Sequence, residues 1–178
     1  MHEISTSEIR ETNSENQPLP EKTKAFENAG KVYETAVHIP TINEKLADTT
    51  YPNTDVQYRK HEFIFNGEKA EGVFPEFKSK FDIALPKELY KESDTVQFKY
   101  CTNKLKEEIL KNPDMEKQFT PRQIDQIQNC APRIAGLTWH HNEMPGKMQL
   151  VEQNTHALCH HTGGRSIWGG GQECRKDQ

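Results

Sequence analysis

Long hydrophobic runs are absent from this 178-residue sequence, and large apolar side chains are scarce. The hydrophobic fraction is 33%, below the roughly 45–50% of an ordinary globular chain. No stretch approaches the ~20 apolar residues that cross a bilayer, so no membrane segment is expected. The first residues, Met1–Ser5, have neither a basic segment nor an apolar stretch. We therefore expect no classical signal peptide, and any export would use another route.

Cysteine is also sparse, and no two cysteines form a C-x-x-C pair. The four lie far apart, at Cys101, Cys130, Cys159 and Cys174. This spacing argues against a thiolate zinc knuckle and against a dense disulfide framework. Reduced structural cysteines are the preferred interpretation, with Cys159 as an additional metal ligand the alternative.

Acidic charge is concentrated in the first third of the chain, which has a net charge of −4 overall. Residues 1–55 carry 10 acidic and 5 basic side chains, whereas residues 100–178 carry 9 and 10. Because phosphate binding favours a basic surface, the acidity counts little against a phosphate substrate at the other end. The polar, proline-interrupted composition of 1–55 predicts a flexible acidic linker or delivery segment, in which a short helix over Glu21–Glu34 is allowed. The ordered domain is expected over 56–178.

The ordered region is expected to begin with a β-hairpin. Tyr58–Phe65 and Glu68–Val73 contain aromatic and β-branched residues on either side of Asn66-Gly67, a pair that readily adopts the positive φ angles of a tight turn. Phe74–Pro86 has apolar groups without a clean period, so we expect irregular segments that cover the core.

Two helices should follow and pack on the core. The first is predicted from Ser93 or Asp94 to Lys111, with Asn112-Pro113 ending it. Its apolar stripe is assigned to six residues: Val96, Tyr100, Cys101, Leu105, Ile109 and Leu110. The second is predicted over Pro121–Gln128, where Thr120 and Gln123 form a capping box before Ile124 and Ile127.

Histidine is the most informative residue type. Five of the eight histidines lie in the 22 residues from His140 to His161. Clustered imidazoles are typical of a metal site, whereas a lone histidine is usually a core or surface group. The clustering favours metal binding.

The local pattern around these histidines predicts two strands and a helix. In a strand over Leu137–His141, alternation places His140 and His141 on opposite faces. One could therefore hold a metal while the other activates water. After a loop containing Pro145-Gly146, Met148–Val151 predicts a returning strand, and a helix should carry His156 and His160 on one face at i, i+4 spacing. Together these elements describe a β-β-α metal unit.

The segment Thr138-Trp139-His140-His141, followed by Met148-Gln149-Leu150-Val151, His156 and His161-Thr162-Gly163-Gly164, resembles the HNH/endonuclease VII nuclease superfamily. More narrowly, it is similar to the subgroup with a Trp-His-His motif that supplies the nuclease domains of bacterial polymorphic toxins. The motif covers about Thr138–Gly171. The resemblance implies an α+β fold with a β-β-α metal (His-Me finger) core at about 137–164, added helices and the N-terminal hairpin.

The resemblance also implies a role for each matching residue. His140 matches the first metal ligand, His141 the general base and His156 a ligand on the helix. Gln149 takes the place of an asparagine that steadies the loop. For the last ligand the motif favours His161, whereas helical spacing favours His160. Trp139 is assigned to the core.

By the same resemblance, the expected activity is hydrolysis of DNA with little sequence specificity, assisted by one divalent metal ion, Zn²⁺ or Mg²⁺. Lys147 and Arg165 are candidates for contacts with the phosphate backbone. The expected biology is an antibacterial toxin, secreted or delivered into a target cell and neutralised by a cognate immunity protein. Two alternatives stay open: an RNA-cleaving toxin of the same chemistry, and a metal-stabilised nucleic-acid-binding module without turnover. The sequence leaves the oligomeric state open.

Overall fold

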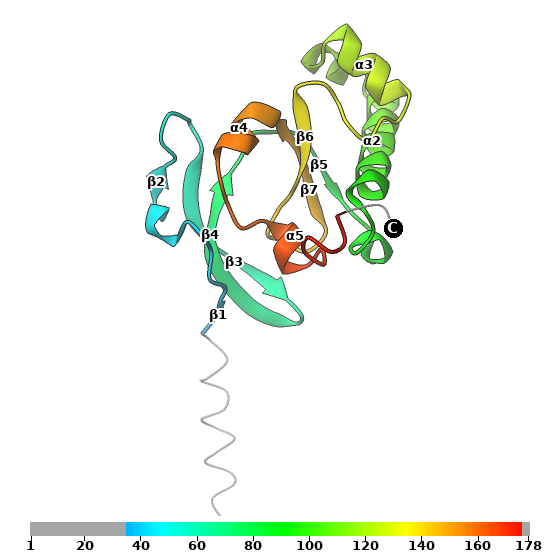
Figure 1. The fold of residues 1–178 in the computed structure, drawn as a ribbon. Coiled ribbons are helices and arrows are strands. Elements are labelled where there is room, and N and C mark those ends of the chain that lie inside the picture. The colour runs from blue at the N-terminus through cyan, green and yellow to red at the C-terminus, as the bar shows by residue number, and fades with distance from the viewer. Residues whose placement is uncertain (1–34, 176–178) are drawn as a thin grey trace, which may run out of the picture. The chain divides into compact units, whose positions relative to one another are not determined.

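Two β-sheets form the framework of residues 35–175, the part of the chain that this computed structural model describes. The expected helix over Glu21–Glu34 lies outside the described residues. The first sheet has the strand order β1-β4-β3-β2 and the second the order β5-β7-β6. With the helices that accompany them, these sheets make a mixed α+β fold, as the sequence predicted (Figure 1).

The predicted hairpin is the centre of the first sheet. Strands β3 (Gln57–Phe65) and β4 (Glu68–Glu76) pair antiparallel along their whole lengths. Asn66 and Gly67 both have positive φ, 52° and 85°, as the turn requires. The hairpin prediction is therefore confirmed.

Short elements before Val56 complete this sheet. Strand β1 (Val37–His38) pairs with β4, and β2 (Thr49–Thr50) pairs with β3. A 3-10 turn, η1 (Glu44–Leu46), lies between them. Residues 37–38 and 49–50 of the segment that the sequence assigned to a linker thus contribute strands to the sheet, while residues 1–34 lie outside the described part.

The second sheet carries the histidine motif. It consists of β5 (Ser79–Ala84), β7 (Lys147–Glu152) and β6 (Leu137–His141), all paired antiparallel. The prediction of irregular structure over Phe74–Pro86 is wrong, because β4 extends to Glu76 and β5 pairs with β7. A register shift between Ser79 and Phe81 interrupts the alternation that would have identified this strand.

A long helix lies beside the second sheet, and a shorter helix packs against the long one (Figure 1). Helix α2 (Asp94–Lys111) begins where Ser93 accepts a hydrogen bond from the Val96 amide, and α3 (Pro121–Gln128) has the predicted capping box. Both helix predictions are confirmed. The buried stripe of α2 differs from the predicted one, because Val96 and Leu110 are exposed. Five buried residues form the true stripe: Gln97, Cys101, Thr102, Leu105 and Ile109.

The remaining helices are short. Turns η2 (Lys87–Leu89) and η3 (Pro113–Gln118) flank α2, and α4 (Gln153–Leu158) and α5 (Gly164–Ile167) follow β7. Since α4 ends at Leu158, the prediction that His156 and His160 share one helical face is wrong. Among the described residues, no helix has the length and apolar character needed to cross a membrane.

Candidate metal centre

Strand β6 sends its two adjacent histidines in opposite directions. His140 lies opposite Gln149 of β7, whereas His141 lies opposite Met148. The His141 side chain contacts Gln97 of α2, and the His140 side chain contacts His156 of α4. Alternation along the strand therefore gives the pair two different environments, as the sequence predicted.

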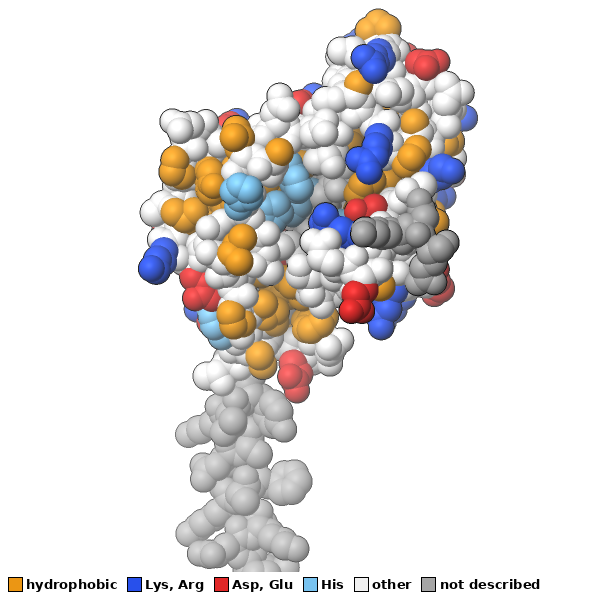
Figure 2. Space-filling view, in the orientation of Figure 1, with side chains coloured by type: hydrophobic (Ala, Val, Ile, Leu, Met, Phe, Trp, Pro, Cys, Tyr) orange, Lys and Arg blue, Asp and Glu red, His pale blue; other side chains and the backbone are white. Residues whose placement is uncertain are grey.

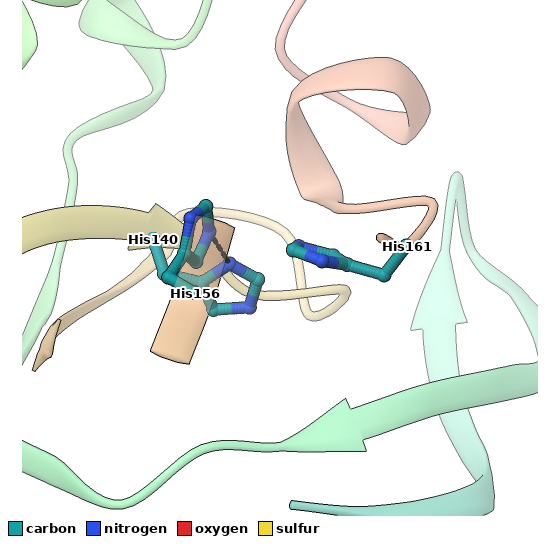
Figure 3. Close-up of side chains that lie close together, drawn as sticks. All are labelled: His140, His156 and His161. Carbon is teal, nitrogen blue, oxygen red and sulfur yellow. Dashed lines mark hydrogen bonds between the residues drawn. The ribbon is translucent and has the colours of Figure 1, made fainter. Parts of the chain in front are cut away.

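Three histidines from different segments converge beside β6 (Figure 3). Each of His140, His156 and His161 offers one ring nitrogen, and these atoms lie within 4.8 Å of one another. Nδ1 of His140 is 3.2 Å from Nε2 of His156. We call these three residues the histidine triad. Figure 2 shows histidine side chains gathered on one face of the molecule.

The triad lies in an apolar setting. The Phe77 ring is 4.9 to 5.3 Å from all three imidazole rings. Burial lowers the pKa of His156 to about 4. Burial and the neighbouring histidines hold the pKa of His140 well below its ordinary value, and burial lowers the pKa of His161. All three imidazoles are therefore neutral near pH 7, which is the form that binds a metal ion.

The backbone around His161 presents one defined ring nitrogen to the triad. His161 Nδ1 donates to the carbonyl oxygen of Cys159 at 2.6 Å, so Nε2 carries no hydrogen. The next carbonyl, that of His160, accepts hydrogen bonds from Tyr58 Oη at 2.9 Å and from Asn43 Nδ2. The His160 side chain is exposed and is not part of the triad. The geometry thus brings together His161, rather than His160, with His140 and His156.

The triad suits a single metal ion. A tetrahedral ion with bonds of about 2.0–2.1 Å to nitrogen places its ligand atoms roughly 3.4 Å apart, close to the 3.2 Å between His140 and His156. Nδ1 of His140, which faces His156, is therefore the nitrogen placed to bind the ion. The other ring nitrogen of His140, Nε2, is buried and has no hydrogen-bond partner among the described residues. Three neutral imidazoles would leave the ion its full charge and an open position.

A pocket with a volume of about 470 Å³ is lined by the three residues of the triad. His141 projects from the other face of β6 and also lines this pocket. Its ring packs against Phe98 and Trp168, with centroid distances of 5.8 and 5.5 Å. Its Nε2 is 2.6 Å from Oε1 of Gln97. Burial and the positive charge of Arg165 lower the pKa of His141 to about 3, so its imidazole is neutral near pH 7 and one ring nitrogen has a free electron pair.

Gln149 of β7 links the loop after β6 to strand β5. Its amide oxygen accepts from Asn142 Nδ2 at 3.2 Å, and its amide nitrogen donates to Asp82 of β5 at 3.3 Å. Asn142 also accepts from the Met144 amide within the loop between β6 and β7. Gln149 lies where a loop-steadying residue was expected.

Comparison with protein families gives one match, which covers more than half of the chain. Residues 66–163 match the model of the DNase/tRNase domain of colicin-like bacteriocins. The chain belongs to this family. No curated protein and no solved structure matches the chain.

The matched region of this colicin-like nuclease domain runs from the turn of the β3–β4 hairpin to Gly163, so it includes the whole triad and His141. It therefore contains the residues on which the resemblance to HNH toxin nucleases was based. Membership makes a nucleic acid the substrate class.

The glycines after His161 have a packing role in this colicin-like nuclease domain. A Cβ atom on Gly164 would collide with the Asn142 carbonyl oxygen and the Trp168 indole, which are hydrogen-bonded to each other at 2.9 Å. A Cβ on Gly163 would lie 3.2 Å from the His141 carbonyl oxygen. The Thr-Gly-Gly sequence thus allows the chain after His161 to return against the end of β6.

The two predicted phosphate-contacting cations have partners within the colicin-like nuclease domain. Lys147 lies 3.4 Å from Asp82 and lines a different pocket, together with His61 and Glu143. The buried Arg165 guanidinium donates to the carbonyl oxygens of Tyr90, Glu92 and Cys174. Both residues therefore have structural contacts in addition to any role in binding.

Sequence reasoning missed two exposed cations in the wall of the pocket. Arg133 makes no ion pair within residues 35–175, and Arg175 approaches Asp94 only at 4.0 Å. Lys and Arg side chains lie beside the histidine patch in Figure 2. Neither arginine lies in a recognisable motif, so only the folded chain brings them to the site. Gln97 was missed although it is a polar residue on an apolar helical stripe, which is a detectable signal.

Proposed function

We propose that residues 36–178 form a metal-dependent endonuclease that hydrolyses DNA phosphodiester bonds with little sequence specificity. The observation that carries this proposal is the histidine triad, which lies in one pocket with a neutral fourth histidine, His141. Strands β6 and β7 with α4 would then be a β-β-α metal (His-Me finger) core. Residues 1–35 would act as the acidic linker or delivery segment.

The chain's own residues divide the work in this proposal. His140, His156 and His161 would hold one divalent ion, Zn²⁺ or Mg²⁺, and Gln149 would steady the loop after β6 through its hydrogen bond with Asn142. When bound, the ion supplies positive charge next to the phosphate and the departing oxygen. His141 takes a proton from water, the water oxygen forms a bond to phosphorus, and the bond from phosphorus to the 3′ oxygen breaks. The 3′ oxygen leaves with a proton from solvent.

Substrate binding is assigned to side chains around the pocket. Arg133 and Arg175 are exposed in its wall and suit contacts with phosphates. Lys147 and Arg165 were the expected contacts, and we place them as supporting residues because each already has an internal partner. No base-reading motif is recognised, which supports low sequence specificity.

The biological role follows the family. An antibacterial nuclease is delivered into a target cell, and the producing cell needs a cognate immunity protein that blocks the site. RNA is the alternative substrate, because the matched family model covers tRNases as well as DNases.

A cleavage assay tests the activity. The full chain is freed of metal with a chelator and incubated with supercoiled plasmid or with tRNA, alone and with Zn²⁺ or Mg²⁺. We expect nicked and linear plasmid only when an ion is present, and no cleavage by the His141→Ala variant, which should still bind Zn²⁺. Cleavage of tRNA alone would establish the RNA alternative. If the unmodified chain binds Zn²⁺ but cleaves neither substrate, it is a binding module.

A further inference from the structure

Gln97 is a polar residue on the buried face of α2, and its exposed fraction is 0%. It occupies the same helical stripe as Cys101 and Leu105, which pack into the apolar core. A buried amide at such a position is costly unless all of its groups are hydrogen-bonded. Its hydrogen bonds therefore indicate why a polar side chain occupies this position.

The orientation of the Gln97 amide is fixed by two backbone carbonyl groups. Nε2 donates to the carbonyl oxygens of Leu89 at 2.6 Å and of Tyr90 at 2.9 Å. Turning the amide over would place Oε1 against both oxygens, with no hydrogen between them. The nitrogen must therefore face Leu89 and Tyr90, which leaves Oε1 to face β6.

The group that Oε1 faces is Nε2 of His141, at 2.6 Å. An amide oxygen only accepts hydrogen bonds, so in a neutral imidazole Nε2 must carry the hydrogen. Nδ1 is then the nitrogen with a free electron pair. No hydrogen bond joins it to any described residue.

We propose that Gln97 is a positioning residue, which holds His141 in the Nε2–H tautomer and leaves Nδ1 to accept the proton from water. The imidazole packs against the Phe98 and Trp168 rings, which restricts its rotation, so the hydrogen bond selects one nitrogen without a change of ring position. The inference rests on the proposed function for its catalytic consequence. The tautomer itself is a property of the folded chain and can be measured without any substrate.

Helix α2 also provides a matched control. Thr102 is as deeply buried as Gln97, and its hydroxyl oxygen accepts from Trp139 Nε1 at 3.1 Å. The variant Thr102→Val removes one buried hydrogen bond between α2 and β6 without touching His141. Gln97→Met removes the hydrogen bond to His141 at similar side-chain volume. Both variants should lose stability, because each lacks one buried hydrogen bond of α2. Only Gln97→Met should change the state of His141.

The tautomer is measured by long-range ¹H–¹⁵N NMR of the full chain, without added metal and again with Zn²⁺, and the His141 signals are assigned by their absence from His141→Ala. We expect hydrogen on Nε2 in the unmodified chain and in Thr102→Val. In Gln97→Met a population with hydrogen on Nδ1 should appear. On plasmid DNA, kcat of this variant should fall about 10–100-fold, the usual cost of removing a partner that orients a functional histidine, with KM and Zn²⁺ affinity little changed.

If Gln97→Met does not fold, Gln97→Leu serves as the second variant, because it also removes the acceptor for Nε2–H. It should show the same population with hydrogen on Nδ1. The proposal is overturned if His141 of the unmodified chain carries its hydrogen on Nδ1. It is also overturned if Gln97→Met keeps both the Nε2–H signature and the original kcat. If no substrate is cleaved while the tautomer shifts as expected, the proposed function fails and the positioning of His141 by Gln97 stands.

Discussion

His140 and His141 are neighbours in sequence, yet they point from opposite faces of β6 into different surroundings. On one face, His140 meets two more imidazoles and the Phe77 ring, and its Nδ1 lies 3.2 Å from Nε2 of His156. On the other face, the Nε2 of His141 is hydrogen-bonded to Gln97. We call these the triad face and the α2 face.

The difference shows how one short motif can supply two chemical roles. A metal ligand needs a neutral nitrogen that no other group occupies. A general base needs one nitrogen free and the other held, so that the ring presents the correct tautomer. Because successive side chains of a strand point to opposite faces, two adjacent residues are sufficient to supply both roles.

Alanine at His140 should have the largest effect, because it removes a ligand from the centre of the triad face. We expect Zn²⁺ affinity to fall on the order of 10²–10³-fold, about one ligand's share of a zinc-binding free energy, with complete loss of cleavage. Isothermal titration with Zn²⁺ measures this. His160→Ala should bind Zn²⁺ with nearly the affinity of the unmodified chain. An equal loss of Zn²⁺ affinity in His140→Ala and His160→Ala would contradict the choice of His161 over His160.

Shortening the chain tests what supports the triad face. Asn43 and Tyr58 hold the His160 carbonyl, and the Ile42 amide donates to Thr162 Oγ1 at 3.2 Å. A chain without residues 1–34 should keep its activity. A chain without residues 1–55 loses Asn43 and Ile42, and its Zn²⁺ affinity should fall roughly 10–100-fold, the usual cost of removing groups that orient a metal ligand.

The two truncated chains are compared by Zn²⁺ titration and by plasmid nicking. Asn43→Ala in the full chain should reproduce part of the loss without removing β2. Equal activity of both truncated chains would show that the sheet and the loop before His161 hold the ligand without this segment.

The glycine pair tests the α2 face. Gly164→Ala places a methyl group against the Asn142 carbonyl oxygen and Trp168, whose ring centroid lies 5.5 Å from that of His141. We expect a loss of roughly 1–3 kcal/mol in the free energy of unfolding, the usual cost of overpacking, and lower kcat. Gly163→Ala meets its nearest atom at 3.2 Å and should be milder. Urea denaturation of both variants measures the difference, and a greater loss in Gly163→Ala would be inconsistent with this packing.

The sequence predicted what depends on local pattern. The hairpin at Asn66-Gly67, the capped helices and the opposite faces of His140 and His141 all follow from turn chemistry and from periods of two and 3.6. The same local reasoning failed for His160, because it assumed a helix longer than the six residues of α4.

Contacts between distant segments could not be predicted. Phe77 reaches the triad from the end of β4, and Arg133 reaches the pocket from the connection between α3 and β6. The sequence around Phe77 and Arg133 contains no motif that would identify either as a site residue. Their positions depend on how the two sheets and the helices pack. Gln97 is different, because the 97, 101, 105 stripe places an amide among apolar residues, and that conflict is visible in the sequence.

The smallest effect is expected at the edge of the triad face, where the loop after His141 meets the first sheet. His61 of β3 forms a 2.6 Å ion pair with the buried carboxylate of Glu143. The hydrogen bond to Glu143 raises the pKa of His61 above its ordinary value. Protonated His61 is therefore favoured by folding. Its contribution to stability is complete below the ordinary pKa of about 6.5 and is lost as the pH rises through the raised value.

His61→Ala should therefore destabilise the domain more at about pH 6 than at about pH 9, on either side of the titration of a histidine with a raised pKa. The difference in the free energy of unfolding should be roughly 1–3 kcal/mol, as for a hydrogen bond to a charged group. Urea denaturation at the two pH values measures it. His38→Ala is the control, because His38 pairs with Glu44 at an exposed position and its loss should have little effect at either pH. An equal or larger loss for His61→Ala at high pH would mean that packing against Phe74, and not the ion pair, holds the loop after His141 to the first sheet.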